Sequence, residues 1–545
     1  MGKKKKRGIK SFAKGIIILM IAQVFVKILG LVYKLYLTNR EGFGDKGNAI
    51  YSSGFQIYAL LLTLSSMGVP NAISKLVSER VAVGDHKGAH RIFKISFVTF
   101  GFIGFLCSAI LFCGAGYIAN RILQIPEAEL TLVALSPSIF FVALSAVIKG
   151  YFNGREDVEV TAKSQTLEQV FKTISSVVLV EIIAIISGTD TVVMAAGANL
   201  ATTLATGLCF SYLYRYYKYE KKEIAFEIKN SINYRPTRIR KTIKQILSVS
   251  IPMSLTSILG SINKNVDSMT VVRGLKKFMS EESAKIQYGI LTGKVDTLVM
   301  LPLSFNMAFS TSLIPAVSSM KAKGNMEGGI RKVKFSMLIS ILIGLPCSVG
   351  MIIFAKPILE LLFPNATSGA FIYQISSIGI IFIILEQTIS GALHGLGKIT
   401  IPALCLSVGV VIKLFLNITL IPLGKEGFIF GGVAGAALAT TICHIVSATL
   451  ELMFLKKYMN IKFDKSKFLF KPIIAVIGMG ILSYFIYLQL LCIINAKLCT
   501  IIAMLLACMI YILLVIMLKI FSKEEIILLP KGDKIYKILT ILHLY

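Results

Sequence analysis

Long apolar runs dominate the chain and restrict its possible folds more than any other feature. Of its 545 residues, 55% are hydrophobic and 16% are charged, a balance too apolar for an ordinary soluble domain. About 20 apolar residues in a helix cross the hydrocarbon layer of a bilayer, where the backbone must satisfy its own hydrogen bonds. We therefore predict an all-α polytopic membrane protein with fourteen transmembrane helices, at residues 13–37, 48–69, 95–118, 130–152, 160–186, 191–214, 246–270, 288–313, 335–355, 370–394, 400–422, 430–455, 472–491 and 498–520.

The net charge of +30 could indicate a nucleic-acid partner, but the positions of the basic residues favour a topological role. With the MGKKKKR end inside, most lysines and arginines fall in cytoplasmic connections, as the positive-inside rule requires. We therefore expect no nucleic-acid partner, and a multi-pass protein of the bacterial cytoplasmic membrane with both termini in the cytoplasm. The most basic connection, residues 215–244, is predicted to be a linker that faces the lipid, with a protein-docking site as the alternative.

The residues that would indicate an enzyme or a cofactor protein are missing from the sequence. Its nine cysteines form no CxxC pair and no spacing typical of metal ligands. GALHGLGKIT (391–400) resembles a phosphate-binding loop but has Ala392 at the first glycine position and Ile399 after the lysine. We therefore expect no metal, no cofactor and no enzymatic activity, and transport that could couple to Na⁺, H⁺ or the membrane potential.

An internal repeat divides the chain into two similar halves. AGANLATT (196–203) returns as AGAALATT (434–441), and ILGLVYK (28–34) returns as ILGSINK (258–264). The repeat spans an even number of predicted helices, so both copies have the same orientation and are related by a two-fold axis along the membrane normal. Equivalent spacing recurs in further positions: Gly84, Gly88, Arg91 and Lys94 against Gly324, Gly328, Arg331 and Lys334, and Gly150, Gly154 and Lys172 against Gly391, Gly395 and Lys413.

This duplication predicts two six-helix lobes with a crevice between them as the substrate path. The predicted domains are an N-lobe (1–218), the linker (219–244), a C-lobe (245–458), two extra helices (459–521) and a cytoplasmic tail (522–545).

Lysines inside apolar helices are the main candidates for substrate binding. A lysine at a helix centre costs roughly 2.5–3.5 kcal/mol on insertion scales, so it must face a wet cavity, find a partner or reach the interface. Lys27, Lys172 and Lys413 lie deepest. For Lys172 the alternative is an intrahelical pair with Glu168, and for Lys27 a partner on a neighbouring helix. The candidates nearer the helix ends, which could instead extend to the headgroups, are Lys34, Lys264 and Lys294.

Four acids lie within predicted helices and are candidates for a proton or cation site, because a carboxylate in low dielectric needs neutralisation. They are Glu181, Asp267, Asp296 and Glu386. Salt bridges are the alternative, for instance between Asp267 and Lys264. Glu386 has no evident local partner and is our first choice for ion coupling.

Two further groups of residues have weaker indications. His394 and His444 are expected to serve in packing or capping rather than ligation. Lys75 and Arg80 lie at the cytoplasmic end of the second helix, where they could gather anionic lipid headgroups before uptake or simply fix the topology.

Several segments together resemble a known family. GVPNAISKLVSE (68–79), IKGYFNGRED (148–157), SQTLEQVFK (164–172) and the helix from KVDTLVMLPLSF (294–305) are similar to the polysaccharide transporters of the stage V sporulation protein B and YtgP-like branch. These belong to the multidrug and oligosaccharidyl-lipid exporter superfamily. The resemblance covers about residues 10 to 520 and implies fourteen helices in two lobes, a central cavity lined mainly by helices 1, 2, 7 and 8, and alternating access.

The resemblance carries over only in part at individual positions. Lys27 occupies the first basic position of the family's helix-one motif, while Tyr33 stands at the second, with Lys34 beside it. Asp296 matches a family acid in helix eight, but Thr297 replaces the neighbouring basic residue. Lysine lacks the planar fork with which arginine holds a phosphate.

We therefore expect a flippase that moves a polyprenyl-diphosphate-linked saccharide, such as a lipid II-like peptidoglycan precursor, from the inner to the outer leaflet. Its partners would be this lipid-linked substrate, membrane lipids and cell-wall synthesis proteins, in growth or in sporulation. One alternative is a cation-coupled exporter of small organic molecules on the same fold. Another is a membrane-embedded glycan polymerase or glycosyltransferase, for which the outer loops are too short.

Overall fold

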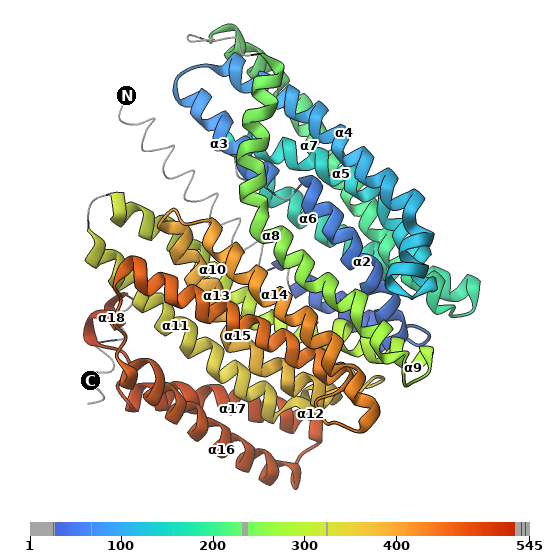
Figure 1. Ribbon diagram of the computed structural model, residues 1–545, viewed down its shortest axis with the longest axis vertical. Helices are drawn as coiled ribbons and strands as arrows, with labels where there is room; N and C mark the ends of the chain where they lie inside the picture. The colour runs from blue at the N-terminus through green and yellow to red at the C-terminus, as the bar shows by residue number, and fades with distance from the viewer. Residues whose placement is uncertain are drawn as a thin grey trace. The chain divides into compact units, whose positions relative to one another are not determined.

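A computed structural model describes residues 25–26, 28–66, 68–155, 157, 159–231, 238–322, 325–528, 536 and 540. All regular secondary structure in these described segments is helical (Figure 1). The chain forms two compact units, the first containing residues up to Lys294 together with Asn417–Gly427, and the second containing Val295–Leu416 and Phe428–Tyr545. The predicted all-α membrane fold is thus confirmed.

Eleven helices of the described residues are long and apolar enough to cross a membrane. They coincide with eleven of the predicted spans, and a helix also covers each described part of the other three. Residues 28–37 of the first span are helical, α8 covers the seventh, and η3 with α10 covers the eighth. The exact number of membrane crossings stays a prediction.

The first unit contains helices α2 to α9 and short π- and 3-10-helical turns. Their bounds are α2 Gly44–Ser66, α3 Val69–Ala82, α4 His86–Tyr117, η1 Ile118–Leu123, η2 Pro126–Ala128, α5 Glu129–Gly154, α6 Glu159–Ser187, α7 Thr191–Lys229, α8 Ile239–Leu275, α9 Glu281–Gly289 and η3 Ile290–Val295, whose last residue already belongs to the second unit. Helix α7 extends to Lys229, so the first part of the predicted linker 219–244 is helical.

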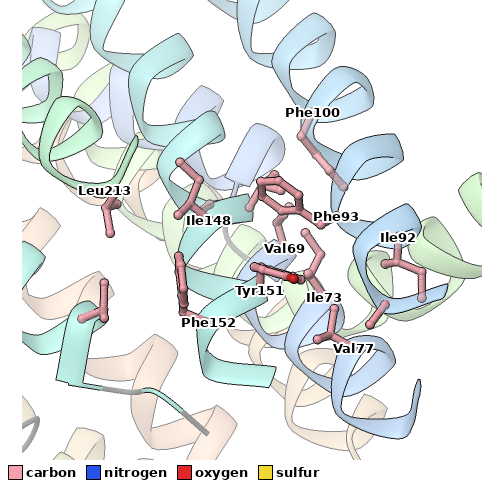
Figure 2. Close-up of a cluster of buried hydrophobic side chains, with 14 of the residues drawn as sticks. Val69, Ile73, Val77, Ile92, Phe93, Phe100, Ile148, Tyr151, Phe152 and Leu213 are labelled. Carbon is pink, nitrogen blue, oxygen red and sulfur yellow. The ribbon is translucent and has the colours of Figure 1, made fainter. Parts of the chain in front are cut away.

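Helix α3 is fixed in the first unit by a buried apolar cluster (Figure 2). Ile73 and Val77 on α3 are fully buried against Phe93 of α4 and against Ile148 and Phe152 of α5. The apolar residues recur every three or four positions on each helix, which places them on one helix face. This packing holds the end of α5 that leads to Gly154 against α3.

The second part of the chain forms α10 to α17, the short helix α18 and two short turns. Their bounds are α10 Asp296–Ala322, α11 Met326–Ile353, α12 Ala355–Leu362, α13 Ala370–Gly395, α14 Thr400–Leu420, η4 Pro422–Glu426, α15 Gly432–Met459, η5 Ser466–Phe470, α16 Lys471–Leu491, α17 Ala496–Met517 and α18 Lys523–Leu528, with the end of α14 and η4 belonging to the first unit. Helices α16 and α17 pack on α11 through a separate apolar cluster that includes Leu338, Met479 and Tyr511.

The two units are built around equivalent cores. Leu313 and Val317 on α10 are buried against Val333 of α11 and against Ile389 and Leu393 of α13. Under the sequence repeat, these five positions correspond to the five core residues of the first unit named above. The duplication therefore repeats the packing as well as the sequence.

The repeated glycines explain how the helices of each core approach so closely. A β-carbon on Gly150 would lie 2.8 Å from the carbonyl oxygen of Pro70, and one on Gly391 would lie 2.7 Å from that of Ser310. Four residues further along, a β-carbon on Gly154 or Gly395 would again lie 2.8 Å from a backbone oxygen. Glycine is needed at these positions because no side chain fits between the two backbones.

Polar contacts repeat with the same correspondence. Asp85 caps α4 by accepting a hydrogen bond from the amide of Gly88, and Asn325 caps α11 in the same way, both at 2.8 Å. The hydroxyl of Thr203 donates to a backbone carbonyl of α5, and that of Thr441 donates to one of α13. The repeat of AGANLATT thus preserves a contact between neighbouring helices.

The grouping by contacts differs from the predicted lobes at two places. The repeat assigns residues 245–294 and 417–427 to the C-lobe, but both stretches pack with the first unit. Helix α8 contacts α2, α3 and α4, and α9 contacts α2. The predicted lobe boundaries stay a prediction, since contacts in one conformation do not define which helices move together.

Candidate functional site

Two of the predicted lysines meet at one aromatic cluster in the first unit. The ammonium of Lys34 lies 4.5 Å from the ring centre of Tyr51, and that of Lys172 on α6 lies 4.8 Å from Phe55 and 5.5 Å from Tyr33. The rings connect the lysines, because the hydroxyls of Tyr33 and Tyr51 hydrogen-bond at 2.6 Å and Tyr51 stacks on Phe55. We call Tyr33, Lys34, Tyr51, Phe55 and Lys172 the lysine–aromatic cluster.

Lys172 contacts aromatic rings rather than an acid within this cluster. The predicted alternative, a pair with Glu168 one turn earlier, is not formed; Glu168 instead lies 3.7 Å from the ammonium of Lys149 on α5. Among the described residues Lys172 forms no ion pair, and its contacts are with ring faces. Cation–π contacts stabilise an ammonium by about 0.5–2 kcal/mol without cancelling its charge, so Lys172 can still attract an anion.

Lys34 and Lys294 do not extend to the headgroups in this structure. Lys34 is only 6% exposed. Lys294 is completely buried, and its ammonium lies 2.9 Å from the carboxylate of Asp45 at the start of α2. Sequence reasoning missed Asp45, which lies far from Lys294 in the chain and outside the predicted spans. A role of Lys294 in substrate binding stays a prediction, but its ammonium already faces the carboxylate of Asp45.

The π-helical turn η3 packs closely on the start of α2. A β-carbon on Gly289 would lie 1.8 Å from the carbonyl oxygen of Asp45, and one on Gly293 would lie 2.4 Å from the side chain of Asn48. Turns of π-helix inside longer helices are often found at functional sites. Here the turn brings Lys294 to Asp45.

A second group of ion pairs surrounds α9. Lys285 is 4% exposed and lies 2.5 Å from Glu127 and 2.7 Å from Glu281. Lys276 lies 2.7 Å from the same Glu281 carboxylate. Hydrogen bonds from Lys276 and then Lys285 hold the pKa of Glu281 down at about 2. A more exposed pair, Lys46 with Glu282, lies beside this group at 2.8 Å.

Two of the predicted acids have partners within the first unit. Glu181 accepts two hydrogen bonds from the guanidinium of Arg40, at 2.8 and 3.0 Å, and one from the hydroxyl of Tyr36. Asp267 accepts a hydrogen bond from the amide of Asn417 at 3.0 Å. Glu181 is therefore held in a two-point salt bridge, the alternative considered for these acids.

The structure places the remaining candidates individually. Lys413 on α14 is 1% exposed, Asp296 is half-buried at the start of α10, and Lys264 on α8 is exposed. Lys27 lies outside the described residues. The two candidates for gathering headgroups are both on α3: Lys75 is exposed, and Arg80 forms a 2.9 Å ion pair with Asp85.

Glu386 in the second unit lies in a buried polar cluster. Its carboxylate is 2.6 Å from Nδ1 of His444 and accepts a hydrogen bond from Ser447 at 2.9 Å, both on α15. One turn further along, Ser390 of α13 lies 2.9 Å from each oxygen of Glu451, which is fully buried on α15. We call Glu386, Ser390, His444, Ser447 and Glu451 the glutamate–histidine cluster.

The ring of His444 bonds to an acid on another helix, Glu386, and sequence reasoning missed this contact. The expectation of packing or capping rather than ligation stays a prediction. Glu451 was not among the predicted acids, although it lies inside the predicted span 430–455 and could have been found there. Within the described parts of the chain, no group of three or more histidine, cysteine or acidic side chains is arranged to hold a metal ion.

Family models and known proteins agree on the kind of protein to which the chain is similar. The model of the polysaccharide biosynthesis protein family matches residues 12–321, and the MatE model matches residues 292–419. Stage V sporulation protein B of Bacillus subtilis (strain 168) is 28% identical over 67% of this chain and 69% of its own length. Lipid II flippase MurJ of the same organism is 24% identical over 86% of this chain and 87% of its own.

Solved structures match the same fold. A lipid II flippase MurJ in an inward closed conformation superposes with a TM-score of 0.67 at 16% identity, covering 91% of this chain and 98% of that one. An inward-facing multidrug resistance MATE family transporter of the MOP superfamily gives a TM-score of 0.62 at 16% identity, covering 81% and 98%. The fold is therefore that of the MATE and MOP transporters.

Proposed function

Since this chain belongs to the polysaccharide biosynthesis protein family, we propose that it flips a polyprenyl-diphosphate-linked saccharide, a cell-wall precursor of the lipid II kind, from the inner to the outer leaflet of the cytoplasmic membrane. The relatives named above include a flippase and transporters, which supports a membrane protein that moves a substrate. The diphosphate-linked substrate and the direction are the proposed part.

The lysine–aromatic cluster is the observation that carries this proposal. A diphosphate bears several oxygens that accept charge-assisted hydrogen bonds, and an ammonium is a strong donor to them. Lys172 offers such a donor, because it forms no ion pair with an acid among the described residues. Lys34 lies on the same group of rings. An exporter of organic cations would instead need an acidic surface at this place.

The proposed mechanism needs no covalent step. The polar headgroup would be held against the lysines while the polyprenyl chain stays in lipid, and the protein would alternate between an inward-open and an outward-open state. Transport of this kind requires that the headgroup contacts be strong enough to offset desolvation and weak enough to release the headgroup outside. Lysine suits that requirement because it makes single hydrogen bonds rather than the paired ones of arginine.

The test is reconstitution of the purified protein in liposomes with a fluorescent lipid-linked precursor, whose outer-leaflet fraction is followed with an impermeant quencher. A hydrogen bond to a charged group contributes about 1.5–3 kcal/mol, so we expect Lys172→Ala to slow flipping roughly 10- to 150-fold. The matched control is Lys163→Ala, which removes a lysine of the same helix that is 61% exposed and paired with Glu159.

Two outcomes would contradict the proposal. In the first, Lys172→Ala flips the precursor as fast as the wild type, which would remove the cluster from substrate binding. In the second, the wild type moves organic cations and no precursor, which would favour the exporter. Thermal unfolding of each variant in detergent separates loss of function from loss of fold.

A further inference from the structure

The glutamate–histidine cluster buries three ionisable side chains inside the second unit. The side chains of Glu386 and His444 are 11% and 14% exposed, and Glu451 is 0% exposed. The carboxyls of Glu386 and Glu451 also lie close enough to repel each other when both are charged. Burying a carboxylate without a cationic partner costs several kcal/mol, so such a group binds a proton instead.

The hydrogen bonds indicate where the protons lie. Ser390 is within 2.9 Å of both oxygens of Glu451, but a hydroxyl has one hydrogen and can donate to only one of them. The other oxygen is then best explained as the protonated one. The 2.6 Å contact between Glu386 and His444 needs a hydrogen between the carboxylate and Nδ1, and this pair is the place for one more proton. With one proton on Glu451 and one added to the Glu386–His444 pair the cluster is neutral, and without either proton a negative charge is left in a buried place.

The other unit shows that the fold does not need these groups. By the repeat, Glu386, Ser390 and Glu451 correspond to Ser145, Lys149 and Leu213 of the first unit, and His444 corresponds to Thr206. There Lys149 is paired with Glu168 at 3.7 Å. Helices α5 and α7, the counterparts of α13 and α15, thus carry no acid at these positions, and the lysine at the Ser390 position pairs with α6 instead.

We propose that Glu386, His444 and Glu451 form a proton-binding site in the second unit, and that the proton held there is the coupling ion of the transport proposed above. The inference of coupling rests on the proposed function, whereas the proton site itself does not. Along α15 the residues His444, Ser447 and Glu451 are spaced three and four apart, so they share one face of the helix. Proton donors and acceptors therefore follow one another along that face toward the end of α15.

The groups that face the cluster from other helices are neutral or weakly acidic. The thiol of Cys405 on α14 lies within electrostatic range of both glutamates. From α10 and α11, the uncharged Asn306 and Ser340 bond to the neighbouring part of α13 at Thr388. No lysine or arginine in the described segments forms an ion pair with Glu386 or Glu451. Protonation is therefore the available way to neutralise them.

Infrared difference spectroscopy of the purified full-length protein tests the site without any substrate. At neutral pH we expect the carbonyl stretch of a protonated carboxylic acid, which Glu451→Gln removes and Glu386→Gln weakens or shifts. Glu360→Gln is the matched control, because Glu360 is an exposed acid of the same unit paired with Lys356. A wild-type spectrum without this band near neutral pH overturns the proposal before any variant is made.

The coupling is tested in proteoliposomes with an imposed pH gradient. A gradient of one pH unit changes the equilibrium constant of transport about tenfold for each coupled proton. In the wild type, the ratio of precursor in the outer leaflet to precursor in the inner leaflet should therefore shift by up to about tenfold. Glu386→Gln and Glu451→Gln should abolish the shift, and Glu360→Gln should keep it. Unchanged gradient dependence in both Gln variants overturns the coupling. If the wild type flips no precursor but keeps the infrared band, the proposed function fails while the proton site stands.

Discussion

The buried pair of Lys294 and Asp45 provides a strong test of how charge is accommodated in this fold. The two charged atoms lie 2.9 Å apart, and the side chains are 0% and 10% exposed. With an effective dielectric constant of about 20 their attraction is about 6 kcal/mol, much of which offsets desolvation. Asp45→Asn removes the carboxylate and leaves the ammonium buried, which should cost about 3–5 kcal/mol of folding stability.

The neighbouring residue supplies the control. Lys46 and Glu282 form a pair of nearly the same length, 2.8 Å, but their side chains are 38% and 65% exposed. Solvent screens such a pair, so Glu282→Gln should leave the folding stability nearly unchanged. The measurement is unfolding of each variant in detergent micelles, followed by temperature and by denaturant.

A double variant completes the comparison. Combining Asp45→Asn with Lys294→Met removes both charges and should recover most of the stability lost by Asp45→Asn, because no buried charge is left without its partner. The reasoning is refuted if Glu282→Gln destabilises as much as Asp45→Asn. It is also refuted if the double variant is no more stable than the single one.

Three further predictions follow from the contacts described. Gly150→Val and Gly391→Val should each destabilise the protein by at least about 1–3 kcal/mol, because the added atoms have no space against the backbone; equal stability to wild type in a thermal melt would contradict this. Glu281 has a pKa of about 2 in the folded protein, below its ordinary value of 4.5. Its stabilising effect is therefore complete above pH 4.5 and is lost as the pH falls toward 2. Thermal melts at successive pH values should show that Glu281→Gln loses less stability on acidification than the wild type. Arg40→Lys should weaken the hold on Glu181, since lysine cannot make both hydrogen bonds, and double-variant cycles with Glu181→Gln would show a smaller coupling energy for lysine than for arginine.

Helix positions and the duplicated packing could be predicted from the sequence because both depend on short-range patterns. Apolar runs set the helices, and the spacing of Gly150 and Gly154 against Gly391 and Gly395 indicated equivalent places in the two halves. The structure adds the reason for the spacing, which is contact between backbones. The grouping of residues 245–294 with the first unit depends on contacts that no local pattern encodes.

The partners of the candidate residues were harder to predict than the candidates. Depth in a helix singled out Lys172, and the lack of a local partner singled out Glu386. The rings around Lys172 and the imidazole beside Glu386 come from other helices. A sequence does not say which faces of distant helices meet. Glu451 is different, because an acid within an apolar span is visible in the sequence and needed only to be counted.

The four repeat glycines also restrict how this protein could vary. In a complete map of single substitutions, Gly150, Gly154, Gly391 and Gly395 should form two matched minima of tolerance, one in each half, because even alanine adds an atom within 3 Å of the facing helix. Exposed apolar positions on the same helices, such as Leu130 and Phe371, should accept most apolar residues. Each half of the chain would thus carry an independent copy of the same mutational constraint, and neither copy could compensate for damage to the other.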